Sequence, residues 1–193
     1  HGFHEYFGPA DSLSRRLGSS TSESCNVYNM LKLSRHLFMW EPRGVIADYY
    51  ERALFNQILS SQHPESGQVI YNLSLEMGGH KQYQNPEWFT CCIGTGMETH
   101  SKYGSHIYFH NYEELYINQY IASKLDWKEK GLELTQSTEF PREESSQFSF
   151  SIGQPVQLTL FVRYPSWAER GIEISINGDN QRIESSKGSY LAI

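Results

Sequence analysis

The 193-residue sequence is poor in cysteine, in basic clusters and in long apolar runs, and each shortage excludes a class of protein. Three cysteines, two of them adjacent, make a poor disulfide framework. Lys and Arg number 16 against 22 Asp and Glu, and the net charge of −6 argues against nucleic-acid partners and a polybasic membrane anchor. No stretch approaches the roughly 20 apolar residues of a membrane helix.

Several catalytic signatures are also missing. The sequence contains no Walker loop, no Gly-x-Ser-x-Gly elbow and no dinucleotide-binding fingerprint. Aromatic residues, by contrast, make up 14% of a chain that is only 38% hydrophobic. Such a composition suits a protein that handles carbohydrate, but it suits many other proteins too.

The first part of the chain has the pattern of helices. Apolar residues recur at helical spacing over 24–40, which predicts a helix there. Pro42 is typical of a helix start and opens a second helix with an apolar face that extends to Ile58. We expect a short strand around Val69–Leu75 and a third helix over roughly Met97–Tyr108.

The pattern changes to short strands after about residue 112. Asn177-Gly178 follows an alternating segment and is a strong hairpin signal. Helices followed by strands indicate an α + β protein of two domains, 1–112 and 113–193. Strands are predicted at 115–121, 132–138, 148–152, 156–162, 172–176 and 189–193.

The cysteines are the sharpest chemical feature. Cys91 and Cys92 lie where a loop enters a helix, and the backbone N–H groups there stabilise a thiolate. Glu23 lies two residues before Cys25. Side chains at this spacing diverge on a helix, so these two point to the same side only in an extended segment or a helix cap. One Glu and three Cys make four ligands, the number that tetrahedral zinc takes, and thiolates favour zinc. The alternative for Cys25 is a small buried apolar residue at a helix start.

Three motifs resemble one family of enzymes and extend the interpretation. The motifs are Ser22-Glu23-Ser24-Cys25-Asn26-Val27, Ala47-Asp48-Tyr49-Tyr50-Glu51-Arg52 and Cys91-Cys92-Ile93-Gly94-Thr95-Gly96-Met97-Glu98. They are similar to those of the β-L-arabinofuranosidases of glycoside hydrolase family 127 and its relative, family 146. The resemblance continues through 112–127 and Tyr164-Pro165-Ser166-Trp167-Ala168, and so covers nearly the whole chain. The Gly94-Thr95-Gly96 turn is closer to family 146.

The resemblance implies a fold and a metal centre. Residues 1–112 would be the C-terminal part of a catalytic (α/α)6 toroid, and 113–193 a truncated β-sandwich. The resemblance also implies that zinc is held by one glutamate and three cysteines, which here are Glu23, Cys25, Cys91 and Cys92.

The resemblance further implies a retaining mechanism on terminal β-L-arabinofuranosyl groups of plant glycans. Cys91 would be the nucleophile, and Glu5, the matching carboxylate in a Gly/His-rich segment, the acid/base. Most retaining glycosidases pair two carboxyl groups, so a sulfur nucleophile needs another means to become a thiolate near neutral pH, and metal coordination provides one.

Other functions stay open from the sequence. The chain could belong to a hydrolase for another plant cell-wall sugar, such as an acidic branched sugar of pectin. It could instead carry a closed structural Glu/Cys3 zinc site without catalysis, or bind carbohydrate through its strand half.

The chain also looks like an internal fragment, because it starts without Met and ends inside a strand pattern. We therefore expect the isolated piece to be inactive. The compartment and a homodimer of the full-length protein are left open.

Overall fold

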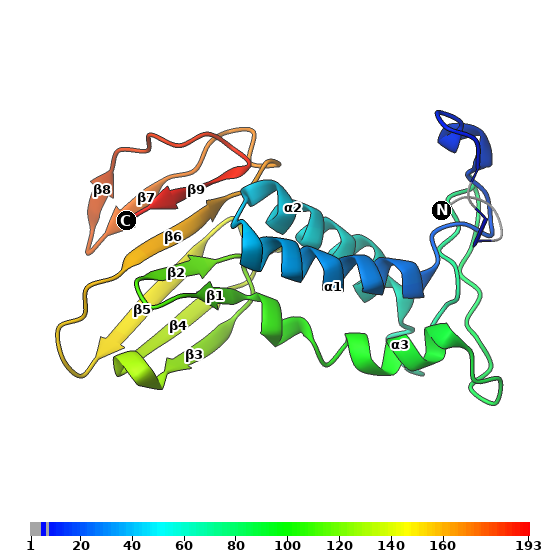
Figure 1. Cartoon of the computed structure of the whole chain (residues 1–193), viewed down its shortest axis with the longest axis horizontal. Coiled ribbons are helices and arrows are strands. Elements are labelled where there is room, and N and C mark those ends of the chain that lie inside the picture. Colours follow the sequence, from blue (N-terminus) through cyan, green and yellow to red (C-terminus); the bar gives the residue numbers. More distant parts are fainter. Residues whose placement is uncertain (1–4, 7) are drawn as a thin grey trace. The chain divides into compact units, whose positions relative to one another are not determined.

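A computed structural model describes residues 5, 6 and 8–193 (Figure 1). These residues form two compact units, one running to Leu37 and resuming over Tyr49–Lys102, the other comprising Phe38–Asp48 and Tyr103–Ile193. Helices characterise the first unit and strands the second, so the chain is a mixed α and β structure, as predicted. In the part of the chain described, no helix combines the length and apolar character that crossing a membrane requires.

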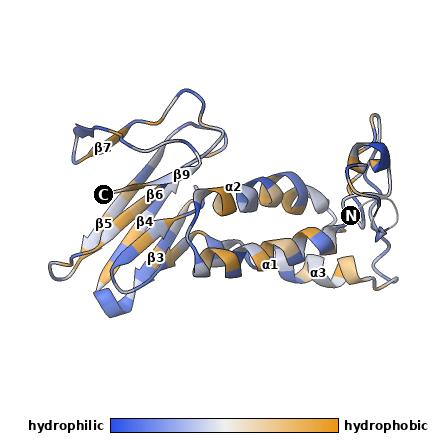
Figure 2. Ribbon diagram, turned by 45° about the horizontal axis from the view of Figure 1, so that its top comes forward, coloured by the Kyte–Doolittle hydropathy of each residue, from blue (hydrophilic) through white to orange (hydrophobic). Residues whose placement is uncertain are grey.

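The first two helices match the sequence pattern. Helix α1 (Ser24–Trp40) occupies the predicted range, and α2 (Gly44–Ala53) continues into a π-helical turn, η3 (Leu54–Ile58), and a 3-10 turn, η4 (Leu59–Ser61). A further 3-10 turn, η2 (Leu13–Arg16), precedes them. Apolar residues recur along α1 and α2 (Figure 2), and most of the predicted face of the second helix is buried. Its buried members are Tyr50, Leu54 and Ile58.

The third helix begins earlier than predicted. Helix α3 is Cys91–Thr99, and a 3-10 turn, η5 (Tyr103–His106), follows it, so the expectation of Met97–Tyr108 was wrong. Thr90 caps the helix by accepting a hydrogen bond from the Ile93 N–H at 3.4 Å, which starts the helix at the cysteines. Gly96 then allows close packing, because a Cβ there would lie 2.8 Å from Cγ1 of Val69.

The segment around Val69–Leu75 is extended but forms only isolated bridges, including Glu23 with Asn72, in place of the predicted strand. Its backbone is paired to the segment before α1. The Ser24 N–H donates to the Tyr71 carbonyl at 2.9 Å, and the Leu73 N–H donates to the Ser22 carbonyl at 3.1 Å. This pairing places residue 71 beside the start of α1.

The second unit contains three sheets. A four-stranded sheet has the order β1-β2-β6-β9, in which β2 and β6 are parallel, a three-stranded sheet has the order β3-β4-β5, and β7 pairs with β8. Asn177 and Gly178 both have positive φ and form the predicted hairpin turn. The turn η6 (Lys128–Lys130) joins β3 to β4. The strands are β1 (Tyr108–His110), β2 (Glu114–Ile117), β3 (Ser123–Trp127), β4 (Leu132–Thr138), β5 (Ser146–Ile152), β6 (Thr159–Tyr164), β7 (Ile174–Ile176), β8 (Asp179–Gln181) and β9 (Ser189–Ala192).

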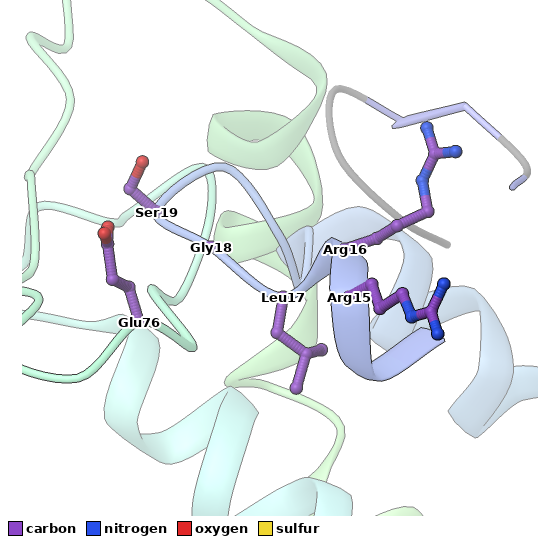
Figure 3. Close-up of a pocket in the computed structure, with 6 residues that line it drawn as sticks. All are labelled: Arg15, Arg16, Leu17, Gly18, Ser19 and Glu76. Atoms are coloured by element: carbon purple, nitrogen blue, oxygen red, sulfur yellow. The ribbon is translucent and has the colours of Figure 1, made fainter. Parts of the chain in front are cut away.

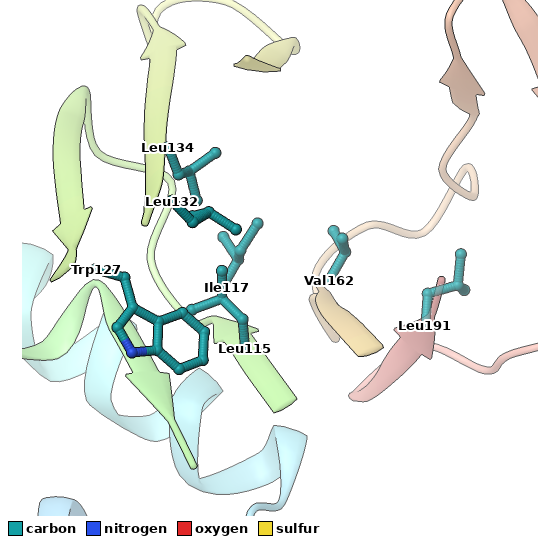
Figure 4. Close-up of a cluster of buried hydrophobic side chains, with 7 residues drawn as sticks. All are labelled: Leu115, Ile117, Trp127, Leu132, Leu134, Val162 and Leu191. Carbon is teal, nitrogen blue, oxygen red and sulfur yellow. The ribbon is translucent and has the colours of Figure 1, made fainter. Parts of the chain in front are cut away.

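Side chains from the two larger sheets share one hydrophobic core (Figure 4). Strands β2, β6 and β9 supply one part of it, and β3 and β4 supply the other. The alternation of buried and less buried residues along β2 and β4 follows from the two-residue repeat of a strand. The core residues are Leu115, Ile117, Trp127, Leu132, Leu134, Val162 and Leu191.

A buried ion pair ties the Phe38–Asp48 segment into the second unit. Nη1 of Arg163, which is 0% exposed, lies 2.5 Å from Oδ1 of Asp48. Nε of Arg163 donates to the Asn118 carbonyl at 2.7 Å, and the Ser166 N–H donates to Oδ2 of Asp48 at 3.1 Å. Each charged group therefore has more than one polar partner, as buried charges require.

Candidate metal centre and active site

Four side chains converge in the first unit. The sulfurs of Cys25, Cys91 and Cys92 and a carboxylate oxygen of Glu23 all lie within 4.8 Å of one another. Cys25 is in the first turn of α1, and the adjacent cysteines are the first two residues of α3. The structure thus brings together the four residues predicted as metal ligands.

The backbone at the start of α1 explains how Glu23 and Cys25 can face the same point. Glu23 precedes the helix and forms an extended bridge with Asn72, whereas Cys25 is already helical. Two residues at this spacing would diverge on a regular helix. The helix boundary between them removes that divergence.

The distances suit a tetrahedral ion. Sγ of Cys91 is 3.7 Å from Oε1 of Glu23, Sγ of Cys92 is 4.0 Å from the same oxygen, and the sulfurs of Cys25 and Cys92 are 3.2 Å apart. Zinc bonds of about 2.3 Å to sulfur and about 2.0 Å to oxygen place tetrahedral ligand atoms roughly 3.5–3.8 Å apart. The site and its sulfur-rich donors therefore fit zinc after small adjustments.

Burial holds two of the sulfurs in their protonated form when no cation is bound. Cys25 and Cys92 are buried, and burial raises the pKa of Cys25 to about 11 and also raises the pKa of Cys92. Burial, with the nearby Glu5 carboxylate, also raises the pKa of Glu23. A divalent cation would reverse this preference, because metal ligands bind in their deprotonated form.

Cys91 differs from the other two cysteines in its exposure. It is exposed, whereas Cys25 is 7% and Cys92 0% exposed. It is also the first residue of α3, where the unpaired backbone N–H groups of a helix favour negative charge. Cys91 is therefore the sulfur that an incoming molecule can reach.

Tyr71 is a member of the site that the sequence did not reveal. Its phenol donates a hydrogen bond to Oε1 of Glu5, and its oxygen lies 3.8 Å from Sγ of Cys91. Its carbonyl oxygen lies 3.7 Å from Sγ of Cys92. The hydrogen bond to Glu5 is the main reason that the pKa of Tyr71 is raised. No motif marked this tyrosine, and the pairing of its segment with the start of α1 brings it here.

Glu5 reaches the site through Tyr71. Glu5 is exposed and has a φ of 65°, and its carboxylate accepts the phenolic hydrogen. The same phenol contacts Cys91, so one side chain links the predicted acid/base and the predicted nucleophile. His4 and Phe7 of the same predicted segment lie outside the described residues.

A hollow of about 370 Å³ in this unit contains none of the four converging residues (Figure 3). Ser19 and Glu76 lie on one side of it, and the side chains of Arg15 and Arg16 extend on the other. Leu17 and Gly18 complete the lining.

Comparison with known protein families gives two matches along the chain. Residues 1–105 match the model of the β-L-arabinofuranosidase GH127 catalytic domain. Residues 114–193 match the model of the GH127 middle domain. A search of curated proteins found no match.

Solved structures share the fold. A protein described as a glycoside hydrolase aligns with a TM-score of 0.76 and 21% identity, over 92% of this chain and 31% of its own. A GH127 β-L-arabinofuranosidase from Geobacillus stearothermophilus T6 aligns with a TM-score of 0.75 and 23% identity, over 91% of this chain and 30% of its own. A GH127 β-arabinofuranosidase aligns with a TM-score of 0.76 and 22% identity, over 92% of this chain and 31% of its own. The chain thus spans about 31% of the length of the first of these structures.

Proposed function

The chain belongs to the β-L-arabinofuranosidases of glycoside hydrolase family 127, and from this premise we propose that it carries the catalytic centre of a retaining β-L-arabinofuranosidase. The substrate would be a plant glycan with terminal β-L-arabinofuranosyl groups. The convergence of Glu23 and three cysteines, with Cys91 alone exposed, is the observation on which the proposal depends.

We propose the corresponding domain division. Residues 1–112 would be the C-terminal part of an (α/α)6 toroid, and 113–193 a truncated β-sandwich. The extents of the two family matches support the division, and the hydrophobic core shared by β2, β4 and β6 supports a sandwich.

In this proposal, Glu23, Cys25, Cys91 and Cys92 would hold a zinc ion. When bound, zinc would keep the sulfurs deprotonated near neutral pH and fix the direction of the Cys91 sulfur. The distances among the four ligand atoms support this assignment.

The reaction would use Cys91 and Glu5. The Cys91 sulfur forms a bond to the anomeric carbon while the bond from that carbon to the leaving oxygen breaks, and Glu5 gives its proton to that oxygen. The Glu5 carboxylate then accepts a proton from water, whose oxygen displaces the sulfur and releases the sugar with retained configuration. Tyr71 would hold the Glu5 carboxylate near the sulfur during both steps.

A structural zinc site is the second candidate function. Two of the three sulfurs are buried, and the cluster joins the starts of α1 and α3, as a site that only stabilises the fold would do. The exposure of Cys91 favours catalysis, because nothing in a purely structural site requires one sulfur to be reachable.

The test is Cys91→Ser in the intact protein, measured on a chromogenic β-L-arabinofuranoside and a panel of other plant sugars. Catalysis by Cys91 predicts loss of activity by about 10³-fold or more with the fold retained. Mass spectrometry of the wild type with a slow substrate should then show a sugar attached to Cys91. A stable, zinc-containing wild type without activity on any sugar would favour the structural role. Activity confined to another sugar would reassign the substrate.

A further inference from the structure

We propose that Thr95 is a positioning residue of the metal centre. Its hydroxyl group would hold the Cys25 sulfur as a permanent metal ligand and thereby leave Cys91 as the sulfur that reacts. The inference rests on the proposed function, because it requires that Glu23 and the three cysteines bind zinc. It assigns a role to a residue that is not itself a ligand.

The position of Thr95 follows from the geometry of α3. Thr95 lies three and four residues after the adjacent cysteines, which places it one turn further along the same side of the helix. Its Oγ1 lies 3.3 Å from Sγ of Cys25 and 3.3 Å from the carbonyl oxygen of Cys92. Thr95 thus reaches from α3 to the cysteine of α1.

The number of hydrogens on each group decides whether Thr95 or Cys25 is the donor of this contact in the metal-bound protein. A threonine hydroxyl has one hydrogen to donate and can also accept. A Cys25 thiol has one hydrogen, which can go to the Cys92 sulfur at 3.2 Å or to Oγ1 of Thr95, and the Thr95 hydrogen can go to the Cys92 carbonyl. A metal-bound thiolate carries no hydrogen, so the contact persists only if Thr95 donates to the sulfur. The charged acceptor makes that the stronger bond.

The three sulfurs therefore differ in their surroundings. Cys25 is buried and next to the Thr95 hydroxyl, and Cys92 is fully buried. Cys91 is exposed, and the nearby Tyr71 phenol donates its hydrogen to Glu5 and not to the sulfur. A hydrogen bond withdraws charge from a thiolate and lowers its nucleophilicity, so this arrangement favours reaction at Cys91.

The experiment compares Thr95→Val with Thr95→Ser in the intact protein. Zinc affinity is measured by competition with a chromophoric chelator. We expect Thr95→Val to weaken zinc binding by about tenfold, the lower end of the effects seen for groups that support a ligand, and Thr95→Ser to restore it. In the cobalt-substituted protein, the sulfur-to-cobalt absorption band should shift in the valine variant and not in the serine variant.

A second pair of variants tests the proposal even if Thr95→Val does not fold. Thr95→Ala and Thr95→Ser leave the same space and differ only in the hydroxyl, so serine should bind zinc about tenfold more tightly than alanine. Thr99→Val is the matched control, because it also removes a buried hydroxyl from α3. It should leave the zinc affinity unchanged.

The outcomes separate the two proposals. Equal zinc affinity in the wild type and in the valine, serine and alanine variants would overturn the role of Thr95 alone. A wild type that does not bind zinc would overturn the metal centre itself, and with it this inference.

Discussion

Tyr71 donates its phenolic hydrogen to the carboxylate of Glu5, 66 residues away in the sequence. The same oxygen lies 3.8 Å from Sγ of Cys91. A single side chain thus relates the proposed acid/base to the proposed nucleophile, and removing its hydroxyl tests both assignments.

The first prediction concerns Tyr71→Phe, which removes the hydroxyl and keeps the ring. A positioned acid/base contributes about 10²- to 10⁴-fold to a rate, so a Glu5 carboxylate without its hydrogen-bond donor should lower kcat/KM by about tenfold or more. Steady-state kinetics measure the effect. Tyr83→Phe, a change of the same kind at another partly buried tyrosine of this unit, should retain wild-type kinetics. Unchanged kinetics in the Tyr71 variant would remove Tyr71 from the site.

The second prediction concerns metal removal. The cluster connects the first turn of α1 to the start of α3, so a bound ion that is absent from the unfolded chain stabilises the fold. A chelator should lower Tm by about 5 °C or more, and added zinc should restore it. Cys25→Ser should have a lower Tm and respond less to the chelator. A Tm that is the same with and without metal, checked by elemental analysis, would contradict this.

The third prediction is a pH dependence of the metal-free protein. Burial raises the pKa of Cys25 from 9.0 to about 11, so the folded state favours the thiol. The resulting stability is fully present below pH 9 and is lost as the pH rises through about 11. Urea unfolding under reducing conditions should therefore show a steeper fall in the free energy of unfolding in this window for the wild type than for Cys25→Ala. Parallel curves would show that the thiol does not titrate as proposed.

The fourth prediction concerns the buried ion pair of the second unit. Arg163→Leu leaves the Asp48 carboxylate buried without its cation and should cost about 3–5 kcal/mol of stability. Arg170→Leu breaks the Arg170–Glu144 pair, whose side chains are 86% and 88% exposed, and should cost less than about 1 kcal/mol. Denaturant unfolding measures both. Equal losses would mean that burial does not set the cost.

The fifth prediction concerns packing under α3. Gly96→Ala places a Cβ 2.8 Å from Cγ1 of Val69 and should cost about 1–3 kcal/mol. The matched change Gly94→Ala meets its nearest atom, in Phe89, at 3.5 Å and should be neutral or stabilising, because Ala is the better helix former. Thermal unfolding of the two variants measures this difference in stability. A Gly96→Ala variant as stable as Gly94→Ala would show that the Val69 side chain can move away from the added Cβ without loss of stability.

Much of the local structure could be predicted from local pattern. The apolar repeat over 24–40 matches α1, the predicted strand at 132–138 matches β4, and Asn177-Gly178 forms its hairpin. The error at α3 has a local cause, since two glycines obscured a helix that Thr90 starts at Cys91. The segment around Tyr71 has the extended conformation that was expected but lacks a continuous strand partner.

The amino-acid sequence on its own determined which groups are available: one Glu-x-Cys pair, one pair of adjacent cysteines and the helices and strands that short-range patterns encode. Tertiary structure alone decided which cysteine is exposed, that Tyr71 lies between Glu5 and Cys91, and that the Thr95 hydroxyl faces Cys25. The reason is physical. Helical and strand periodicity depend on neighbours a few residues apart. Burial and these side-chain contacts depend on the packing of segments 20 to 70 residues apart, which no local pattern records.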